Sequence, residues 1–192
     1  GMVELPTGKM KSREGTVVDA DDMMDEMVNL SREQTEQSGK TEGFTAEELG
    51  WLYETIGMGA LKFYLLRVDP KKKMIFNPKE SIDLHGFTAT FIQYAHARIC
   101  SILRKEHVAL HPDTGRFQAW HAQTDLLKLE KEMILMQEQY AAVLADAAAE
   151  FNPSALCNYC FQLAQLFNTF YDVHRIAKAE SHEKKDLPLT MI

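Results

Sequence analysis

The sequence has few of the features that mark several common classes of protein. It contains only three cysteines in 192 residues, Cys100, Cys157 and Cys160, which excludes a disulfide-stapled secreted domain and fits a reducing cytoplasm. No run of about 18 apolar residues occurs, so a membrane-spanning helix is not expected. No apolar signal segment opens the chain, which argues against secretion.

Short motifs that would identify an enzyme are also missing. The sequence has no glycine-rich loop of the Walker or dinucleotide-binding type and no nucleophile elbow. Cys157 and Cys160 have the CxxC spacing of a zinc or redox pair, but a zinc site needs four ligands and no second pair exists. Both thiols would lie on one apolar helix face. We therefore interpret them as core residues, with zinc or redox chemistry as the alternative, and predict no metal site.

Basic residues are fewer than acidic ones, with 21 Lys and Arg against 28 Asp and Glu and a formal net charge of -7. Taken as a total, this argues against nucleic-acid binding, because phosphates require cations. The distribution changes that conclusion. Residues 19–54 hold eleven acidic groups against two basic ones, whereas residues 55–105 hold nine basic groups against three acidic ones. A local basic field can bind a polyanion, and the alternative is a solvated basic face.

Hydrophobic periodicity and capping signals predict a mainly helical protein. Thr45 and Glu48 form a capping box that starts one helix. Gly57 and Gly59 are expected to interrupt this helix before a short helix over residues 60–67. The other expected elements are helices over residues 19–37, 87–105, 117–127, 125–150 and 153–177, and short strands over residues 16–18 and 74–76.

A short segment near the start of the chain, GKMKSREG, concentrates three cations and a hydroxyl between Gly8 and Gly15. The cations of Lys9, Lys11 and Arg13 can offset the charge of a polyphosphate, and the glycines allow the backbone to approach it closely. The segment is therefore a candidate phosphate-binding loop, with a plain surface loop as the alternative.

Four segments, in the same order along the chain, resemble motifs of arginyl-tRNA synthetase, a class I aminoacyl-tRNA synthetase. The first, GKMKSREGTVV, resembles the KMSKS-type loop of that family. The other three resemble its G-A-D-A-L-R-F-Y-L-L segment, its Y-x-Q-Y-A-H-A-R helix and its N-Y-x-x-x-L-A-Q-x-F-N-x-F-Y helix. In this chain they read GALKFYLL from residue 59, FIQYAHAR from residue 91 and NYCFQLAQLFNTFY from residue 158.

The resemblance implies a mainly α fold. Residues 86–192 would form a DALR-type helical bundle that binds the anticodon and lacks the final helix of the family. Residues 1–85 would form the end of the catalytic region, an α-rich stem-contact region with the KMSKS-type loop and a short strand. The family activates arginine with ATP and Mg²⁺ and transfers it to tRNA(Arg) in the cytoplasm. Because the half that carries the HIGH motif is not in this sequence, the resemblance implies a ligase fragment that is inactive alone and has no cofactor bound.

Site residues follow from the same motif matches. The catalytic positions are Lys9, Ser12 and Arg13, and the ATP-binding positions are Lys9, Met10, Lys11 and Ser12. The anticodon-binding positions are Tyr94, Arg98, Tyr171 and Arg175, where rings would stack on unpaired bases and cations would meet phosphates. The alternative for the two tyrosines is core packing with the hydroxyl at the surface. The alternative for the chain is a stand-alone helical RNA-binding or protein-interaction module derived from such a domain.

Overall fold

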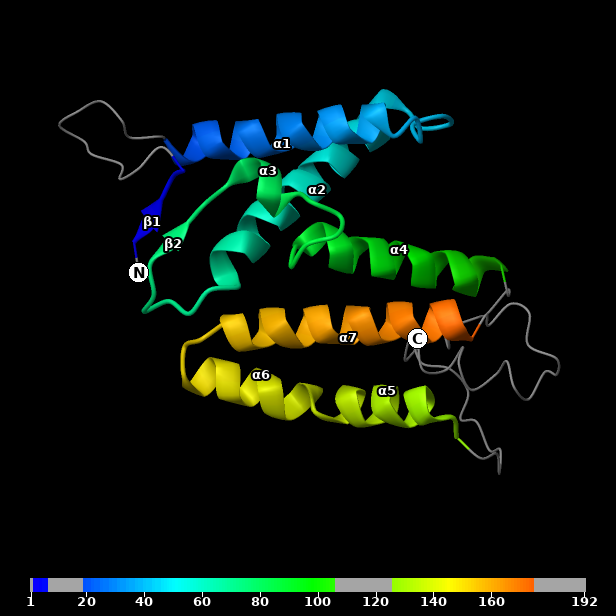
Figure 1. Ribbon diagram of the computed structural model, residues 1–192. Helices are drawn as coiled ribbons and strands as arrows, with labels where there is room; N and C mark the ends of the chain where they lie inside the picture. Colours follow the sequence, from blue (N-terminus) through cyan, green and yellow to red (C-terminus); the bar gives the residue numbers. More distant parts are fainter. Residues whose placement is uncertain (1, 7–18, 106–125, 175–192) are drawn as a thin grey trace.

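The computed structural model describes residues 2–6, 19–105 and 126–174 of the chain. This part is mainly α, as the sequence predicts, with one small parallel sheet (Figure 1). In chain order the elements are β1 (Val3–Glu4), α1 (Ala20–Gln37), α2 (Ala46–Leu66), β2 (Met74–Ile75), α3 (Pro78–Ser81), α4 (Ala89–Lys105), α5 (Lys128–Glu138), α6 (Tyr140–Ala149) and α7 (Ser154–Val173).

The start of α2 and the position of β2 agree with the sequence. Thr45 donates its backbone N–H to Glu48 Oε2 at 2.8 Å, and the Glu48 N–H donates to Thr45 Oγ1 at 3.2 Å. This is the predicted capping box, and an N-cap of this kind contributes about 1 kcal/mol. The partner of β2 was not predicted. It is β1, which pairs with β2 in parallel and places Val3 opposite Met74.

The predicted interruption of α2 at Gly57 and Gly59 is wrong, because α2 is continuous. The two glycines mark close approaches by other helices. A β-carbon at Gly57 would lie 2.7 Å from the carbonyl oxygen of Met27 in α1, and one at Gly59 would lie 2.5 Å from Nε2 of Gln93 in α4. Glycine weakens a helix by about 1 kcal/mol relative to alanine. Here it allows α1 and α4 to cross α2 at short range.

The single helix predicted over residues 125–150 is also wrong. Two helices, α5 and α6, meet at Gln139, whose N–H donates to the carbonyl of Met136 at 3.2 Å. A bond to the third preceding residue tightens the chain locally and marks the break. The start of α5 is set by Glu130, whose Oε2 accepts the N–H of Leu127 at 2.7 Å. The uniform helix-forming composition of this region carries no signal for such a break.

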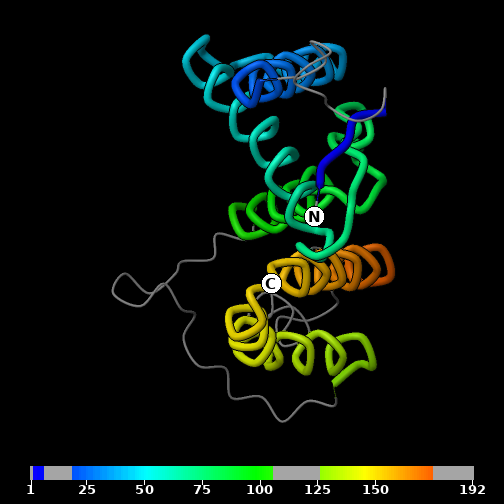
Figure 2. The backbone as a smooth tube through the Cα atoms, turned by 90° about the vertical axis from the view of Figure 1, so that its left-hand side faces the viewer, coloured from blue at the N-terminus to red at the C-terminus, as the bar shows by residue number. Residues whose placement is uncertain are grey.

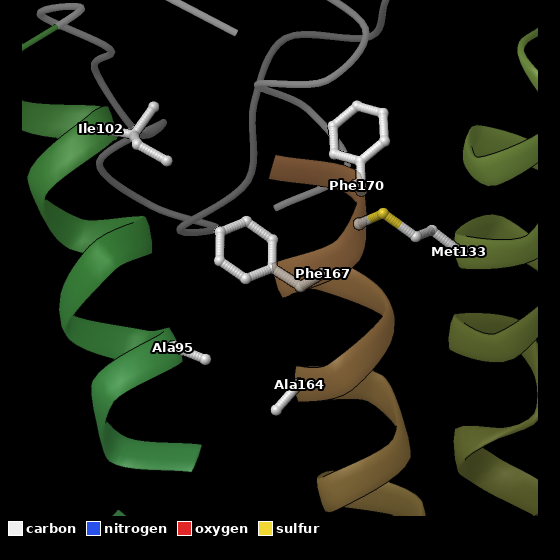
Figure 3. Packing of buried hydrophobic residues seen from close by; sticks show 6 residues of the cluster. All are labelled: Ala95, Ile102, Met133, Ala164, Phe167 and Phe170. Atoms are coloured by element: carbon white, nitrogen blue, oxygen red, sulfur yellow. The ribbon is translucent and has the colours of Figure 1, made fainter. Parts of the chain in front are cut away.

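Buried side chains form two clusters. One lies between α1, α2 and the segment from β2 to the residue after α3; it contains Met27, Ala60, Leu61, Tyr64, Phe76 and Ile82. The other lies between α4, α5 and α7; it contains Ala95, Ile102, Met133, Ala164, Phe167 and Phe170. Figure 3 shows Phe167 directed toward α4 and Phe170 beside Met133 of α5. In the second cluster α7 is therefore the central helix.

A chain of aromatic rings joins α2 to α7 through the segment before α4. Phe87, just before α4, has its ring centroid 5.3 Å from that of Phe63 in α2 and 4.7 Å from that of Phe161 in α7. Edge contacts of this kind contribute about 1 kcal/mol each beyond their buried area. Arg67 at the end of α2 donates a hydrogen bond to the Phe87 carbonyl. The domain boundary predicted after residue 85 falls at this junction, and it stays a prediction.

Candidate nucleic-acid interface

Three of the residues predicted to bind the anticodon meet at the surface between α4 and α7. Tyr94 and Arg98 are one turn apart on α4, and Tyr171 is near the end of α7. The guanidinium carbon of Arg98 lies 4.9 Å from the centroid of the Tyr94 ring and 4.8 Å from that of Tyr171. A cation at this distance over a ring makes a favourable cation–π contact. We call these three residues the Tyr–Arg–Tyr stack.

Polar groups on both helices hold Arg98 in the stack. Its Nη1 donates to Oδ1 of Asn168 at 2.8 Å, and its Nη2 donates to the Tyr94 hydroxyl at 3.3 Å. Nη1 also lies 3.8 Å from Oδ1 of Asp172, whose side chain is 73% exposed. An ion pair so exposed contributes little. The bond to Asn168 therefore does most to fix the guanidinium, and a group fixed in advance loses less entropy when a ligand binds.

The two tyrosines differ in how much of each ring is available. Tyr94 is 48% exposed. Tyr171 is partly buried against the cluster of α4, α5 and α7, where its ring centroid lies 6.1 Å from that of Phe167. Core packing, the alternative from the sequence, thus describes one side of Tyr171 but not Tyr94. Tyr94 has the ring surface that an incoming planar group could cover.

Sequence reasoning missed two members of this site, Asn168 and Asp172. Residues three or four positions apart on a helix share a face, and both residues have that spacing from Tyr171 or from each other. This spacing places Asn168 on the face of Tyr171, but it does not show that the Asn168 side chain meets Arg98 of another helix. The fourth predicted residue, Arg175, lies outside the described residues.

The predicted phosphate loop also lies outside the described residues. Its members are Lys9, Met10, Lys11, Ser12 and Arg13. In the part of the chain that the structure describes, no group of three His, Cys, Asp or Glu side chains is arranged to hold a metal ion. No helix in that part is long and apolar enough to cross a membrane.

Cys157 and Cys160 are free thiols on α7 and are partly buried. Burial raises the pKa of Cys157 from 9.0 to about 11, with a smaller contribution from the neighbouring Cys160 thiol. Burial raises the pKa of Cys160 as well. Because the thiolate is the form that binds metal and attacks disulfides, the raised pKa values disfavour both roles. The two residues are only partly buried, however, and neither belongs to the two clusters of buried side chains.

A helical domain with a stacked aromatic–cation surface fits one described family. The DALR anticodon binding domain matches residues 92–190, a range that includes the whole Tyr–Arg–Tyr stack. The chain belongs to this family. More particularly, it corresponds to a C-terminal portion of arginyl-tRNA synthetase, about 30% of that protein, as the motifs in the sequence suggested.

The relatives and the solved structures agree on this correspondence. The chain is 49% identical to arginine–tRNA ligase of Flavobacterium psychrophilum and 45% identical to that of Bacteroides fragilis. Each alignment has 185 residues and covers 96% of this chain and 30% of the relative. The structure of Thermus thermophilus arginyl-tRNA synthetase matches 99% of this chain and 30% of its own chain with a TM-score of 0.81 at 23% identity. That likeness establishes a common fold.

Proposed function

We propose that this chain is the tRNA-binding portion of an arginine–tRNA ligase, and that it binds the anticodon loop of tRNA(Arg) through the Tyr–Arg–Tyr stack. The observation that carries the proposal is the meeting of Tyr94, Arg98 and Tyr171, from two helices far apart in the sequence, at one partly exposed surface. The bases of an anticodon loop are unpaired, so aromatic rings can stack on them.

Each residue has a separate part in this proposal. The exposed ring of Tyr94 is the platform for one base, and a stacked base contributes about 1–3 kcal/mol. Arg98 has a ring against its guanidinium on both helices, so it holds the two tyrosines in register and supplies positive charge to the backbone of the loop. Tyr171 anchors the stack to the core of the domain.

The test is binding of the chain to a tRNA(Arg) transcript, measured by fluorescence anisotropy. Tyr94→Ala removes the platform and should weaken binding about tenfold or more. Tyr171→Ala should weaken it as well. Tyr94→Phe is the matched control, because it keeps the ring and loses only the hydroxyl bond to Arg98; it should bind nearly as the wild type does. Unchanged affinity in both alanine variants, with their helicity intact by circular dichroism, would overturn the proposal.

A second part of the proposal concerns the candidate phosphate loop. In the intact ligase, which would use ATP with Mg²⁺ and arginine, we assign the ATP phosphates to Lys9, Ser12 and Arg13, with Met10 and Lys11 in the same loop. The cations would stabilise the charge that develops on the leaving pyrophosphate. The support is the sequence of the loop, together with relatives that align over 96% of the chain.

This second part has its own test. Lys9→Ala in a full-length ligase should lower arginine-dependent ATP–pyrophosphate exchange strongly and leave tRNA affinity unchanged. An exchange rate equal to that of the wild-type ligase would contradict the assignment. The 192 residues alone should not catalyse the exchange, since they span about 30% of the relatives. We place the protein in the cytoplasm, where its three cysteines would stay reduced.

A further inference from the structure

A second surface with cations and an aromatic ring lies at the other end of α7. The loop between α2 and β2 lies beside the turn between α6 and α7 in both views of the molecule (Figures 1 and 2). The loop carries Lys71, Lys72 and Lys73, and the turn carries Phe151. We call these four residues the Lys–Phe surface. From the length of α7, about 25 Å separates this end from Tyr171.

The three lysines are held in an exposed position by the backbone. Oδ1 of Asp69 accepts the N–H of Lys71 at 2.8 Å, and the Asp69 carbonyl accepts the N–H of Lys72 at 2.9 Å. Directly after Lys73 the chain enters β2 and is fixed against β1. All three side chains are exposed, and no carboxylate of the described residues forms an ion pair with them. Three adjacent cations that have no ion-pair partner among the described residues favour a polyanionic ligand.

Phe151 is unusual both in its backbone angle and in the exposure of its side chain. Its φ is 50°, in the left-handed region that bulky side chains avoid, and the residue is 87% exposed. The Asn152 N–H donates to the Ala147 carbonyl at 2.9 Å, and the Phe151 N–H donates to the Ala148 carbonyl at 3.3 Å. This is the Schellman motif, and glycine is the usual residue at its left-handed position. The described residues therefore give no packing reason for an aromatic side chain at this position.

We propose that the Lys–Phe surface is a second RNA contact, at which the lysines neutralise backbone phosphates and Phe151 stacks on an unpaired base. Cations that follow a backbone, next to an exposed ring, are the combination that binds single-stranded nucleic acid. The inference rests on the proposed function, because one tRNA would engage the Tyr–Arg–Tyr stack and the Lys–Phe surface together.

The phosphate contacts are tested by the salt dependence of binding. The variant Lys71→Gln/Lys72→Gln/Lys73→Gln removes all three charges. For a tRNA(Arg) transcript, the slope of log affinity against log salt concentration should then become shallower by about 2, since each phosphate contact contributes about 0.7–0.9 to that slope. The triple arginine variant keeps the charge and should keep the slope. Lys40→Gln removes one exposed cation from the turn between α1 and α2 and should change the slope less than Lys72→Gln does.

Phe151→Gly separates binding from folding. Glycine suits the left-handed position, so this variant should melt at a higher temperature than the wild type and yet bind the transcript about 5- to 50-fold less tightly. Phe151→Trp keeps an aromatic face and should retain the affinity. A variant that is more stable and binds equally well would overturn the stacking contact.

The outcomes distinguish this inference from the proposed function. If the wild-type chain does not bind the transcript, both fail. If Tyr94→Ala weakens binding while the lysine triple variant and Phe151→Gly bind as the wild type does, the proposed function stands and the second contact is overturned. If the lysine triple variant loses affinity with an unchanged salt slope, the phosphate contacts are overturned.

Discussion

Two arginines of this protein make the same kind of contact with different consequences. Arg67 lies 3.7 Å from the ring centroid of Tyr64, and Arg98 lies 4.9 Å from that of Tyr94, each a turn away on the same helix. Tyr64 is buried, and Arg67 also bonds to the Phe87 carbonyl, so Arg67 belongs to the packing between α2 and the start of α4. Tyr94 is exposed, so Arg98 belongs to a surface. At the scale of the residue, the spacing along the sequence predicts that the arginine and the tyrosine meet. Only the surrounding packing decides whether the pair belongs to the interior or to a binding surface.

The contact between Asn168 and Arg98 leads to the first prediction. Asn168→Ala removes the acceptor 2.8 Å from Nη1 and leaves the guanidinium free to turn out of the stack. Affinity for a tRNA(Arg) transcript should fall about tenfold or more, since a hydrogen bond to a charged group contributes about 1.5–3 kcal/mol. Asp172→Asn, at an exposed side chain 3.8 Å away, is the matched control and should have a small effect. Equal effects of the two substitutions would contradict the positioning role.

Burial of Cys157 leads to a prediction on pH. Because the pKa of this thiol is raised from 9.0 to about 11, its thiolate fraction at pH 8 should be about 100-fold below that of an unperturbed thiol. Alkylation by iodoacetamide, followed by peptide mass spectrometry, should be slow at pH 8 and accelerate up to about pH 11. The raised pKa stabilises the fold below pH 9.0, and this contribution is lost as the pH rises through about 11. Fast alkylation of the folded chain at pH 8 would show that the thiol is not buried.

At the scale of the element, regular patterns were predictable and contacts between elements were not. The positions of α1, α4 and α7 follow from long amphipathic repeats, within a few residues at their ends. α2 continues through Gly57 and Gly59, where the α1 backbone and the Gln93 side chain of α4 approach closely, and no local pattern shows that role of the two glycines. β1 has two residues, too few for a periodic signal, and it exists because β2 accepts it as a partner.

Three glycines of α2 form a matched series for stability. Gly57→Ala would place a β-carbon 2.7 Å from backbone of α1, and it should destabilise the fold by about 1–3 kcal/mol. Gly59→Ala should cost less, because the contact is with the end of the Gln93 side chain, which can move once its 3.1 Å bond to the Thr55 carbonyl breaks. A β-carbon at Gly50 would have no neighbouring atom within 4 Å, so Gly50→Ala should stabilise the fold by about 0.5–1 kcal/mol. Urea unfolding would measure all three, and a stable Gly57→Ala variant would contradict the account of the α1–α2 crossing.

At the scale of the whole molecule, the net charge conceals the arrangement that matters. The acidic residues 19–54 build α1 and the start of α2, while the basic residues 55–105 include both the lysines after α2 and Arg98 of α4. The sequence was sufficient to find the family and all three residues of the Tyr–Arg–Tyr stack. It was not sufficient to find Asn168 or the left-handed Phe151, because a side-chain bond between helices and a backbone angle have no signature in composition or spacing.

The central claim is that the chain binds the anticodon loop in a way that depends on its bases, and one comparison tests it most directly. The affinity of the wild-type chain is measured for a tRNA(Arg) transcript and for the same transcript with its anticodon bases replaced. We predict that the replacement weakens binding about tenfold or more, and that this difference disappears in Tyr94→Ala, which lacks the platform. Equal affinity of the wild-type chain for the two transcripts would contradict the account.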